Sequence, residues 1–207
     1  MSGHILTCNG GSNSLKCALY DADSLTLTCR MAVDRIHADS TLDIRDASGE
    51  TRLHEEDMPP GYAPALERIV HWVNEQHITL KAAGHRVVHG GRMFDGPVRI
   101  TPQTLTAIRE LTPLAPLHQR HNVALIEQLG EKLPNLPQVA CFDTAFHRSQ
   151  PELNQLYALP HRLCEEEGIV RYGFHGLSYE YIASQLPQHL EEHNRGRVIA
   201  AHLGSGA

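Results

Sequence analysis

Side chains of the kinds that bind phosphate gather near the start of the chain, in the stretch CNGGSNSLK at residues 8–16. Its two glycines leave backbone N–H groups open to an anion, and its polar residues add amide, hydroxyl and ammonium groups. These polar residues are Asn9, Ser12, Ser14 and Lys16. The stretch predicts either a phosphate-binding turn or an ordinary glycine-containing hairpin, and its composition alone leaves both open.

The stretch departs from the P-loop pattern GxxxxGK[ST] at two positions. Leu15 stands where the second glycine is needed, and Cys17 replaces the Ser or Thr that binds magnesium. A P-loop also opens a helix, whereas SLKCALYDAD alternates with the period of a strand. We therefore predict a strand, a Gly/Ser turn and a second strand, with phosphate donors exposed at the tip.

Two more polar groups follow apolar strands later in the sequence. Residues 86–91 end the strand of AAGHRVVHGG, and residues 143–147 follow the strand of QVACF. Ligands of α/β sheets collect at the carboxyl ends of strands, so we expect these groups to converge with residues 9–16. RGRVIAAHLGSGA then repeats the opening, as an apolar strand that runs into a Gly/Ser turn at residues 202–206. Two such units suggest a duplicated fold that holds phosphates between two lobes.

The rest of the sequence supplies the elements that must position these groups. Residues 4–54 read as strands, and apolar residues between positions 66 and 73 recur with helical spacing. Thr101 and Pro102 are typical of an N-cap and a first helical position, and a further helix is expected to end at Gly130. Strands followed by alternating helices and strands predict an α/β fold, with a mixed sheet flanked by helices.

Length and composition disfavour several classes of protein. The chain has 207 residues, enough for one large domain or one domain with part of another. The mild formal charge of -6 predicts no nucleic-acid partner, and no apolar run is long enough for a membrane span. The five cysteines form no CxxC pair, which predicts reduced core residues in a cytoplasmic protein. The fifteen histidines form no HExxH motif, which disfavours a structural zinc site.

Six short segments, taken in order, resemble the acetate kinase family, whose members include propionate kinase and form acyl phosphates. The segments are NGGSNSLK, GHRVVHGG, LAPLH, VACFDTAFH, RYGFHGLS and AHLGSGA. The resemblance implies the ribonuclease-H-like fold of the actin, Hsp70 and sugar-kinase superfamily, with nucleotide between two domains. Because members of the family are longer, it also implies a first domain over residues 1–149 and an incomplete second domain over residues 150–207.

The resemblance implies, position by position, a magnesium ligand and two loops that bind the nucleotide ATP or ADP. Asn9 would help to hold Mg²⁺ beside the phosphates. The first loop would use the side chains of Ser12, Ser14 and Lys16. The second loop would use His202, Leu203, Gly204, Ser205 and Gly206. Ser205 stands where the family usually has asparagine, so we expect one weaker phosphate contact there.

The resemblance also implies which residues bind the carboxylate substrate and which act on the phosphoryl group. Arg86 would bind acetate, propionate or the phosphoryl group, with Val88 and Leu117 as a small apolar wall. The catalytic residues would be Asp143, His118 and His175. Because a carboxylate is already a nucleophile, Asp143 is expected to bind magnesium or fix the geometry rather than to accept a proton.

The implied reaction converts ATP and a short carboxylate to ADP and an acyl phosphate, with magnesium. The family's second-half arginine and adenosine pocket have no counterpart here, so the resemblance implies that this chain is not active alone. Its expected partners are a missing second half or a second copy in a homodimer. Two alternatives stay open: an inactive lobe that acts as an interaction protein, and a sugar kinase of the same superfamily.

Overall fold

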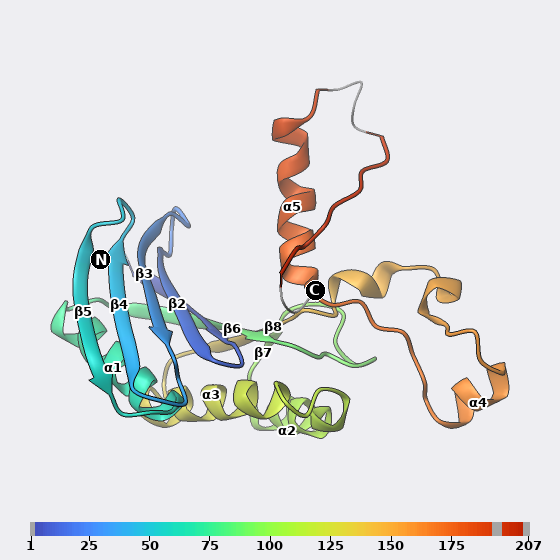
Figure 1. Ribbon diagram of the computed structural model, residues 1–207, viewed down its shortest axis with the longest axis horizontal. Coiled ribbons are helices and arrows are strands. Elements are labelled where there is room, and N and C mark those ends of the chain that lie inside the picture. Colours follow the sequence, from blue (N-terminus) through green and yellow to red (C-terminus); the bar gives the residue numbers. More distant parts are fainter. Residues whose placement is uncertain (1–2, 192–195, 205–207) are drawn as a thin grey trace. The chain divides into compact units, whose positions relative to one another are not determined.

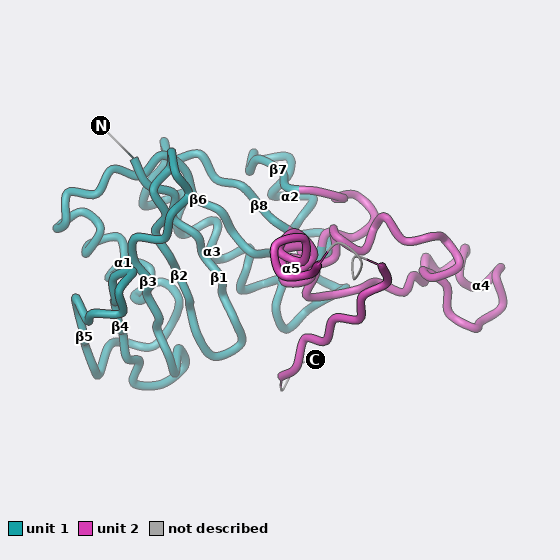
Figure 2. The backbone as a smooth tube through the Cα atoms, turned by 90° about the horizontal axis from the view of Figure 1, so that it is seen from above, with its two compact units in different colours: residues 1–89, 97–141 teal, residues 90–96, 142–207 magenta. Residues whose placement is uncertain are grey.

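The computed structural model describes residues 3–191 and 196–204, in two compact units. The first unit holds residues 1–89 and 97–141, and the second holds residues 90–96 and 142–207 (Figure 2). The second unit is thus assembled from two separate stretches of the chain. The domain boundary expected after residue 149 stays a prediction.

A mixed sheet forms the frame of the first unit (Figure 1). It has eight strands in the order β5-β4-β3-β2-β1-β6-β8-β7. The strands are β1 (His4–Gly10), β2 (Ser14–Asp21), β3 (Leu27–Asp34), β4 (Ser40–Asp46), β5 (Thr51–Met58), β6 (Leu80–Val87), β7 (Val98–Arg99) and β8 (Gln138–Phe142). Because β1 pairs antiparallel with β2 and parallel with β6, the predicted mixed sheet is confirmed.

The hairpin of β1 and β2 confirms the predicted strand, turn and strand. Cys8 lies opposite Cys17, and Asn9 lies opposite Lys16. Successive side chains of a strand point to opposite faces, so the two buried cysteines face the core while Asn9 and Lys16 share the other face. The hairpin therefore carries polar groups on a base of buried residues.

Three helices cover one face of this sheet (Figure 1). They are α1 (Tyr62–Glu75), α2 (Pro102–Glu110) and α3 (Gln119–Lys132). Leu6 of β1 and Leu19 of β2 are fully buried beneath them, together with Leu66 and Ile69 of α1. Full burial of one such side chain contributes about 1.5–3 kcal/mol, so this layer holds the unit together. The helix predicted around positions 66–73 is confirmed.

The start of α2 is predicted correctly and the end of α3 is not. Thr101 Oγ1 accepts from the backbone N–H of Thr104, whose Oγ1 accepts from the backbone N–H of Thr101. The helix expected to end at Gly130 continues to Lys132. A Cβ at Gly130 would lie 3.1 Å from the side-chain amide of Gln138, so this glycine allows a close approach of β8 instead of ending the helix.

The described residues of the second unit form three short helices and one long one. They are η2 (Phe146–Ser149), η3 (Glu152–Gln155), α4 (His161–Glu166) and α5 (Gly176–His189). The strand predicted within RGRVIAAHLGSGA is wrong for residues 196–204, which form no strand. Ile199 in this segment is 98% exposed, and a strand needs a neighbour that pairs with its backbone. None of the helices in the described part of the chain is long and apolar enough to cross a membrane.

The cysteines of the chain are reduced, as the sequence predicts. All five are free thiols, and all except the half-buried Cys141 are buried. Cys17 Sγ lies 3.8 Å from Cys8 Sγ across the hairpin. Its hydrogen bond to Cys8, together with burial, raises the pKa of the Cys17 thiol well above its usual range, so this thiol stays protonated.

Candidate functional site

Three of the predicted site residues lie together in the first unit, on the face of the sheet opposite α1, α2 and α3. Arg86 Nη1 donates a hydrogen bond of 3.0 Å to Asn9 Oδ1, across the parallel pair of β6 and β1. Lys16 stands opposite Asn9 on β2, and its side chain is exposed. Two cations thus flank one amide, which confirms that the ends of β1 and β6 converge. Such a group can bind a carboxylate or a phosphate.

The turn between β1 and β2 is held by two side chains that the sequence analysis did not single out. Tyr62 Oη, at the start of α1, donates to the carbonyl oxygen of Gly11. His37 Nε2 lies 2.9 Å from the carbonyl oxygen of Ser12. Ser12 is exposed and Ser14 is half-buried, so the hydroxyl groups predicted to bind phosphate lie at an accessible turn.

Two buried amide side chains of α3 fix the segment that follows β6. Asn122 Oδ1 accepts from the backbone N–H of Val88 at 3.0 Å, and its Nδ2 donates to the carbonyl oxygen of Gly10 at 3.4 Å. Gln119 binds both backbone groups of His89, at 3.2 Å and 2.9 Å. Neither amide was predicted as a site residue. Their position in the sequence could have indicated this role, because a polar residue on the buried stripe of a helix must form a hydrogen bond.

The remaining predicted residues of the first unit differ in exposure. Val88 is 8% exposed, whereas Leu117, in the loop before α3, is 77% exposed. A joint apolar wall therefore stays a prediction. His118 is the N-cap residue of α3. Burial lowers the pKa of His121 in the next turn, and the nearby His37 and His118 lower it further.

Asp143 belongs to the second unit, directly after β8, and is 2% exposed. The residues on either side of it pack against the stretch 90–96. The Phe142 ring stacks on that of Phe94 with centroids 4.7 Å apart, and Thr144 Oγ1 accepts from the backbone N–H of Gly90 at 2.9 Å. Thr144 was not predicted as a site residue, although it is part of the segment FDTAF. These contacts fix the backbone on both sides of Asp143.

His175 and His202 come together in the same unit as Asp143. Their rings stack with centroids 4.3 Å apart and planes 5° apart. His175 has a left-handed backbone, with φ 54°, and Gly176 after it donates its N–H to the carbonyl oxygen of Asp143 at 2.8 Å. His202 Nδ1 lies 3.2 Å from Ser178 Oγ. Strained backbone of this kind occurs at functional sites, where surrounding contacts maintain it.

The second predicted phosphate loop is described only in part. Leu203 is exposed, and Gly204 lies in an exposed bend. Ser205 and Gly206 fall outside the described residues. Phosphate binding by this loop stays a prediction.

Comparison with known proteins identifies the family. The family model described as the Acetokinase family matches residues 4–207. The chain belongs to the acetokinase family. Acetate kinase of Rhodopseudomonas palustris is 44% identical over 217 residues, which cover 100% of this chain and 54% of that protein. Acetate kinase of Bacillus subtilis is 39% identical over 98% of this chain and 53% of its own length. The chain thus spans about half the length of the curated relatives it matches.

Solved structures of other acetokinases share the fold of this chain. Porphyromonas gingivalis acetate kinase aligns with a TM-score of 0.80 and 32% identity, over 90% of this chain and 49% of that one. A propionate kinase from Francisella tularensis gives a TM-score of 0.81 and 31% identity, over 90% and 48% of the two chains. The predicted fold of the actin, Hsp70 and sugar-kinase superfamily is therefore confirmed.

The chemistry of the site fits a magnesium ion that arrives with a nucleotide. Among the described residues, no cluster of three or more His, Cys, Asp or Glu could hold a metal ion alone. A magnesium ion that arrives with a nucleotide needs no such cluster, because Mg²⁺ commonly takes one or two protein ligands and completes its shell with phosphate oxygens and water. Asn9 offers a suitable amide oxygen, which accepts from Arg86 in this structure. Its role as a magnesium ligand stays a prediction.

Replacing Gly176 by alanine is expected to detach α5 from Asp143 in this acetokinase. The new Cβ would clash with the carbonyl oxygen of Asp143 and would lie 3.0 Å from Phe146 Cβ. Overpacking of this kind costs about 1–3 kcal/mol. The free energy of unfolding should fall by that amount in a urea titration followed through the NMR signals of α5.

The matched control for this substitution is Gly96→Ala in the same unit. A Cβ at Gly96 would meet nothing within 4 Å, so we expect no loss of stability. If the two variants unfold at the same urea concentration, the close contact between Gly176 and Asp143 does not hold α5 in place.

Proposed function

We propose that this chain forms the carboxylate- and phosphate-binding part of a kinase that converts ATP and a short carboxylate to ADP and an acyl phosphate. The observation that carries the proposal is the group of Asn9 on β1, Lys16 on β2 and Arg86 on β6, in a chain of the acetokinase family. Relatives named acetate kinase and propionate kinase support acetate and propionate as the carboxylates.

Neutralising negative charge is the main task that the proposal gives to the first unit. Phosphoryl transfer needs positioning and electrostatic stabilisation more than covalent chemistry. Arg86 has a planar guanidinium, which can bind two oxygens of a carboxylate or a phosphoryl group. Lys16 lies along the nucleotide phosphates, together with the hydroxyl groups of Ser12 and Ser14. Val88 and Leu117 contact the alkyl part of the carboxylate.

The second unit supplies a carboxylate and histidines in this proposal. Asp143 acts through its charge and position, because the substrate carboxylate attacks without losing a proton. His175 stabilises oxygens of the transferring phosphoryl group, and His118 of the first unit does the same. His202 begins the second phosphate loop, which continues to Gly206.

Magnesium bound with the nucleotide would neutralise charge on the phosphates during transfer. Asn9 is the residue of this chain that would contribute to holding the ion, through its amide oxygen. The Arg86 guanidinium would then turn from Asn9 to an oxygen of the substrate. The proposal also places the protein in the cytoplasm. Its partner is either a second copy, in a homodimer, or a separate polypeptide that supplies the second half.

The test traps acyl phosphate with hydroxylamine from acetate or propionate and magnesium ATP. It uses two proteins: the 207-residue chain, and a chimera that joins it to the remaining part of the Rhodopseudomonas palustris relative. We expect acyl hydroxamate from the chimera. Comparison with the chain alone then measures how much of the reaction these residues support by themselves.

Two controls separate this proposal from other kinase chemistry. Glucose and glycerol replace the carboxylate in parallel reactions, and we expect no phosphorylation of either. Arg86→Ala in the chimera should abolish most of the acyl phosphate, whereas Arg162→Ala, on exposed α4, should not. A folded chimera that makes no acyl phosphate, or that phosphorylates a sugar instead, would contradict the proposal.

A further inference from the structure

The carbonyl groups of the β1–β2 turn are bound on one side by rings from separate elements. Tyr62 on α1 donates to Gly11 O, and His37 on the β3–β4 connection binds Ser12 O at 2.9 Å. A carbonyl oxygen can only accept, so His37 Nε2 carries the proton. Burial raises the pKa of Tyr62, which keeps its hydroxyl group protonated as a donor.

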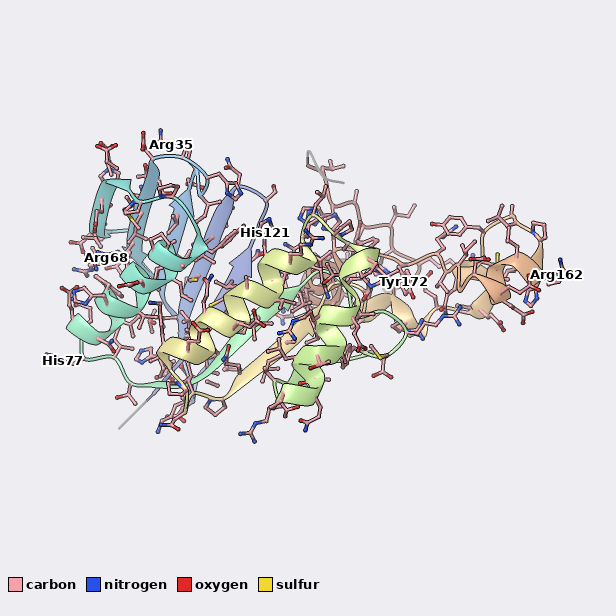
Figure 3. The ribbon with its side chains drawn as sticks, turned by 90° about the horizontal axis from the view of Figure 1, so that it is seen from below. Arg35, Arg68, His77, His121, Arg162 and Tyr172 are labelled. Carbon is pink, nitrogen blue, oxygen red and sulfur yellow. The ribbon has the colours of Figure 1, made fainter. Side chains whose placement is uncertain are left out.

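A third ring completes this arrangement. His121, labelled in Figure 3, lies in the first turn of α3. Its ring centroid lies 5.2 Å from that of Tyr62 and 6.0 Å from that of His37. Since burial lowers the pKa of His121, this ring is neutral at pH 7 and packs as an uncharged aromatic group. Tyr62 is therefore held between the turn and α3.

The backbone around His37 is shaped to bring it to the turn. Arg35, directly after β3, has a left-handed conformation with φ 54° and begins the connection to the antiparallel strand β4. Ile36 is fully buried, its N–H donates to Asn13 O at 3.1 Å, and its carbonyl oxygen accepts from Gly61 N–H at 2.6 Å. A strained residue and a buried anchor thus place the His37 ring against the turn.

The direction of these two carbonyl groups fixes the direction of two amides. A trans peptide is planar, and its C=O and N–H point in opposite directions. The described chain has no cis peptide bonds, so Gly11 O directed toward Tyr62 turns the N–H of Ser12 away from it. In the same way, Ser12 O directed toward His37 turns the N–H of Asn13 away. Neither N–H donates to another backbone group in the described part of the chain.

We infer that Tyr62 and His37 are positioning residues, which orient the consecutive N–H groups of Ser12 and Asn13 as a preformed binding site for a nucleotide phosphate. Successive backbone N–H groups that point the same way make an anion-binding concavity. The inference rests on the proposed function for the identity of the anion. It adds that Tyr62 and His37 orient the site by binding the carbonyl side of the turn, without touching the nucleotide.

The experiment titrates the ¹⁵N-labelled 207-residue chain with ADP, and separately with pyrophosphate, and follows the amide signals of Ser12 and Asn13. Tyr62→Phe removes only the hydroxyl group, and His37→Ala removes the ring. Loss of one neutral hydrogen bond is expected to weaken ADP binding about threefold to tenfold in each variant. His37→Gln should restore binding to within about twofold, because its amide N–H can reach the same carbonyl.

Controls separate positioning from general loss of structure. Tyr20→Phe, elsewhere on β2, and His71→Ala, on the exposed side of α1, should leave the affinity for ADP unchanged. The free energy of unfolding is measured for every variant, and rescue by glutamine distinguishes a lost hydrogen bond from a damaged fold. Unchanged ADP affinity in both Tyr62→Phe and His37→Ala would overturn the inference.

Failure of the proposed function would look different from failure of this inference. If the unmodified chain binds neither ADP nor pyrophosphate, the nucleotide part of the proposed function is wrong for this chain. Hydrogen exchange and ¹⁵N relaxation of Ser12 and Asn13 then decide the inference. Faster exchange and greater motion in Tyr62→Phe and His37→Ala, reversed in His37→Gln, would support orientation of the turn, and unchanged values would overturn it.

Discussion

Asp143→Asn is expected to lower the rate of acyl phosphate formation by the chimera roughly 100-fold to 1000-fold, the effect of removing one electrostatic group from a preorganised site. The substitution keeps the shape of a buried residue that is held on both sides by contacts of its neighbours. It removes only the negative charge. Because Asp143 acts on the transition state in the proposed function, kcat should fall while KM for acetate changes little.

The matched control is Asp95→Asn, which makes the same chemical change at an exposed position of the same unit. It should leave kcat within about twofold of the parent, as expected for a surface substitution away from the site. Asp143→Glu keeps the charge but shifts its position, and we expect a smaller loss than for asparagine only if charge dominates over geometry. An Asp143→Asn chimera with full activity would remove this residue from the catalytic assignment.

Acidification from pH 7 to about pH 4 is expected to reduce the free energy of unfolding by roughly 3 kcal/mol through His85 alone. His85 is buried in β6, with Nε2 2.7 Å from the side-chain amide of Gln138. Burial lowers its pKa from 6.5 to about 4. Between these values the unfolded chain binds a proton that the folded chain does not. The contribution of His85 is therefore complete above pH 6.5 and is lost as the pH falls toward 4.

The measurement is a series of urea titrations between pH 7 and pH 4, on the parent chain and on His85→Gln. Glutamine keeps a polar partner for Gln138 but does not titrate, so its stability should depend less steeply on pH. The other titrating groups are the same in both proteins. One of them is Asp46, whose pKa is lowered to about 2 by hydrogen bonds. His71→Gln, at an exposed position, should follow the parent. Parallel curves for the parent and His85→Gln would contradict the assignment.

Local signals in the sequence predicted the parts of the fold that depend on neighbouring residues. The hairpin at residues 8–16 follows from a Gly/Ser turn between alternating strands, and Thr101 marks its helix because its hydroxyl caps the next turn. The end of α3 was mispredicted because Gly130 allows close contact with Gln138, a residue on a different element, and does not end the helix. The strand expected within RGRVIAAHLGSGA was wrong for residues 196–204 because pairing requires a neighbour, which the sequence pattern does not supply.

The candidate site divides in the same way. Asn9, Lys16 and Arg86 could be grouped in advance, because a hairpin brings Asn9 and Lys16 together and the ends of neighbouring strands converge in a sheet. Tyr62 and His37 could not, because they bind backbone carbonyl groups of residues distant in sequence. No sequence motif indicates a contact of this kind. Sequence patterns therefore indicated the polar groups that lie together on the sheet, but not the side chains that bind the backbone of the β1–β2 turn.

The discontinuous makeup of the second unit constrains how it can be inherited and how it folds. A hydrogen bond between Gly90 and Thr144 joins the two stretches of this unit, and these residues lie 54 positions apart in the sequence. Between them the chain runs through α2, α3 and β8, so formation of those elements shortens the loop that the contact must close. A crossover between two acetokinase genes just before Phe142 would separate its ring from the partner ring of Phe94. Recombination within this family should therefore preserve the segment 90–96 and the segment after β8 as a co-inherited pair.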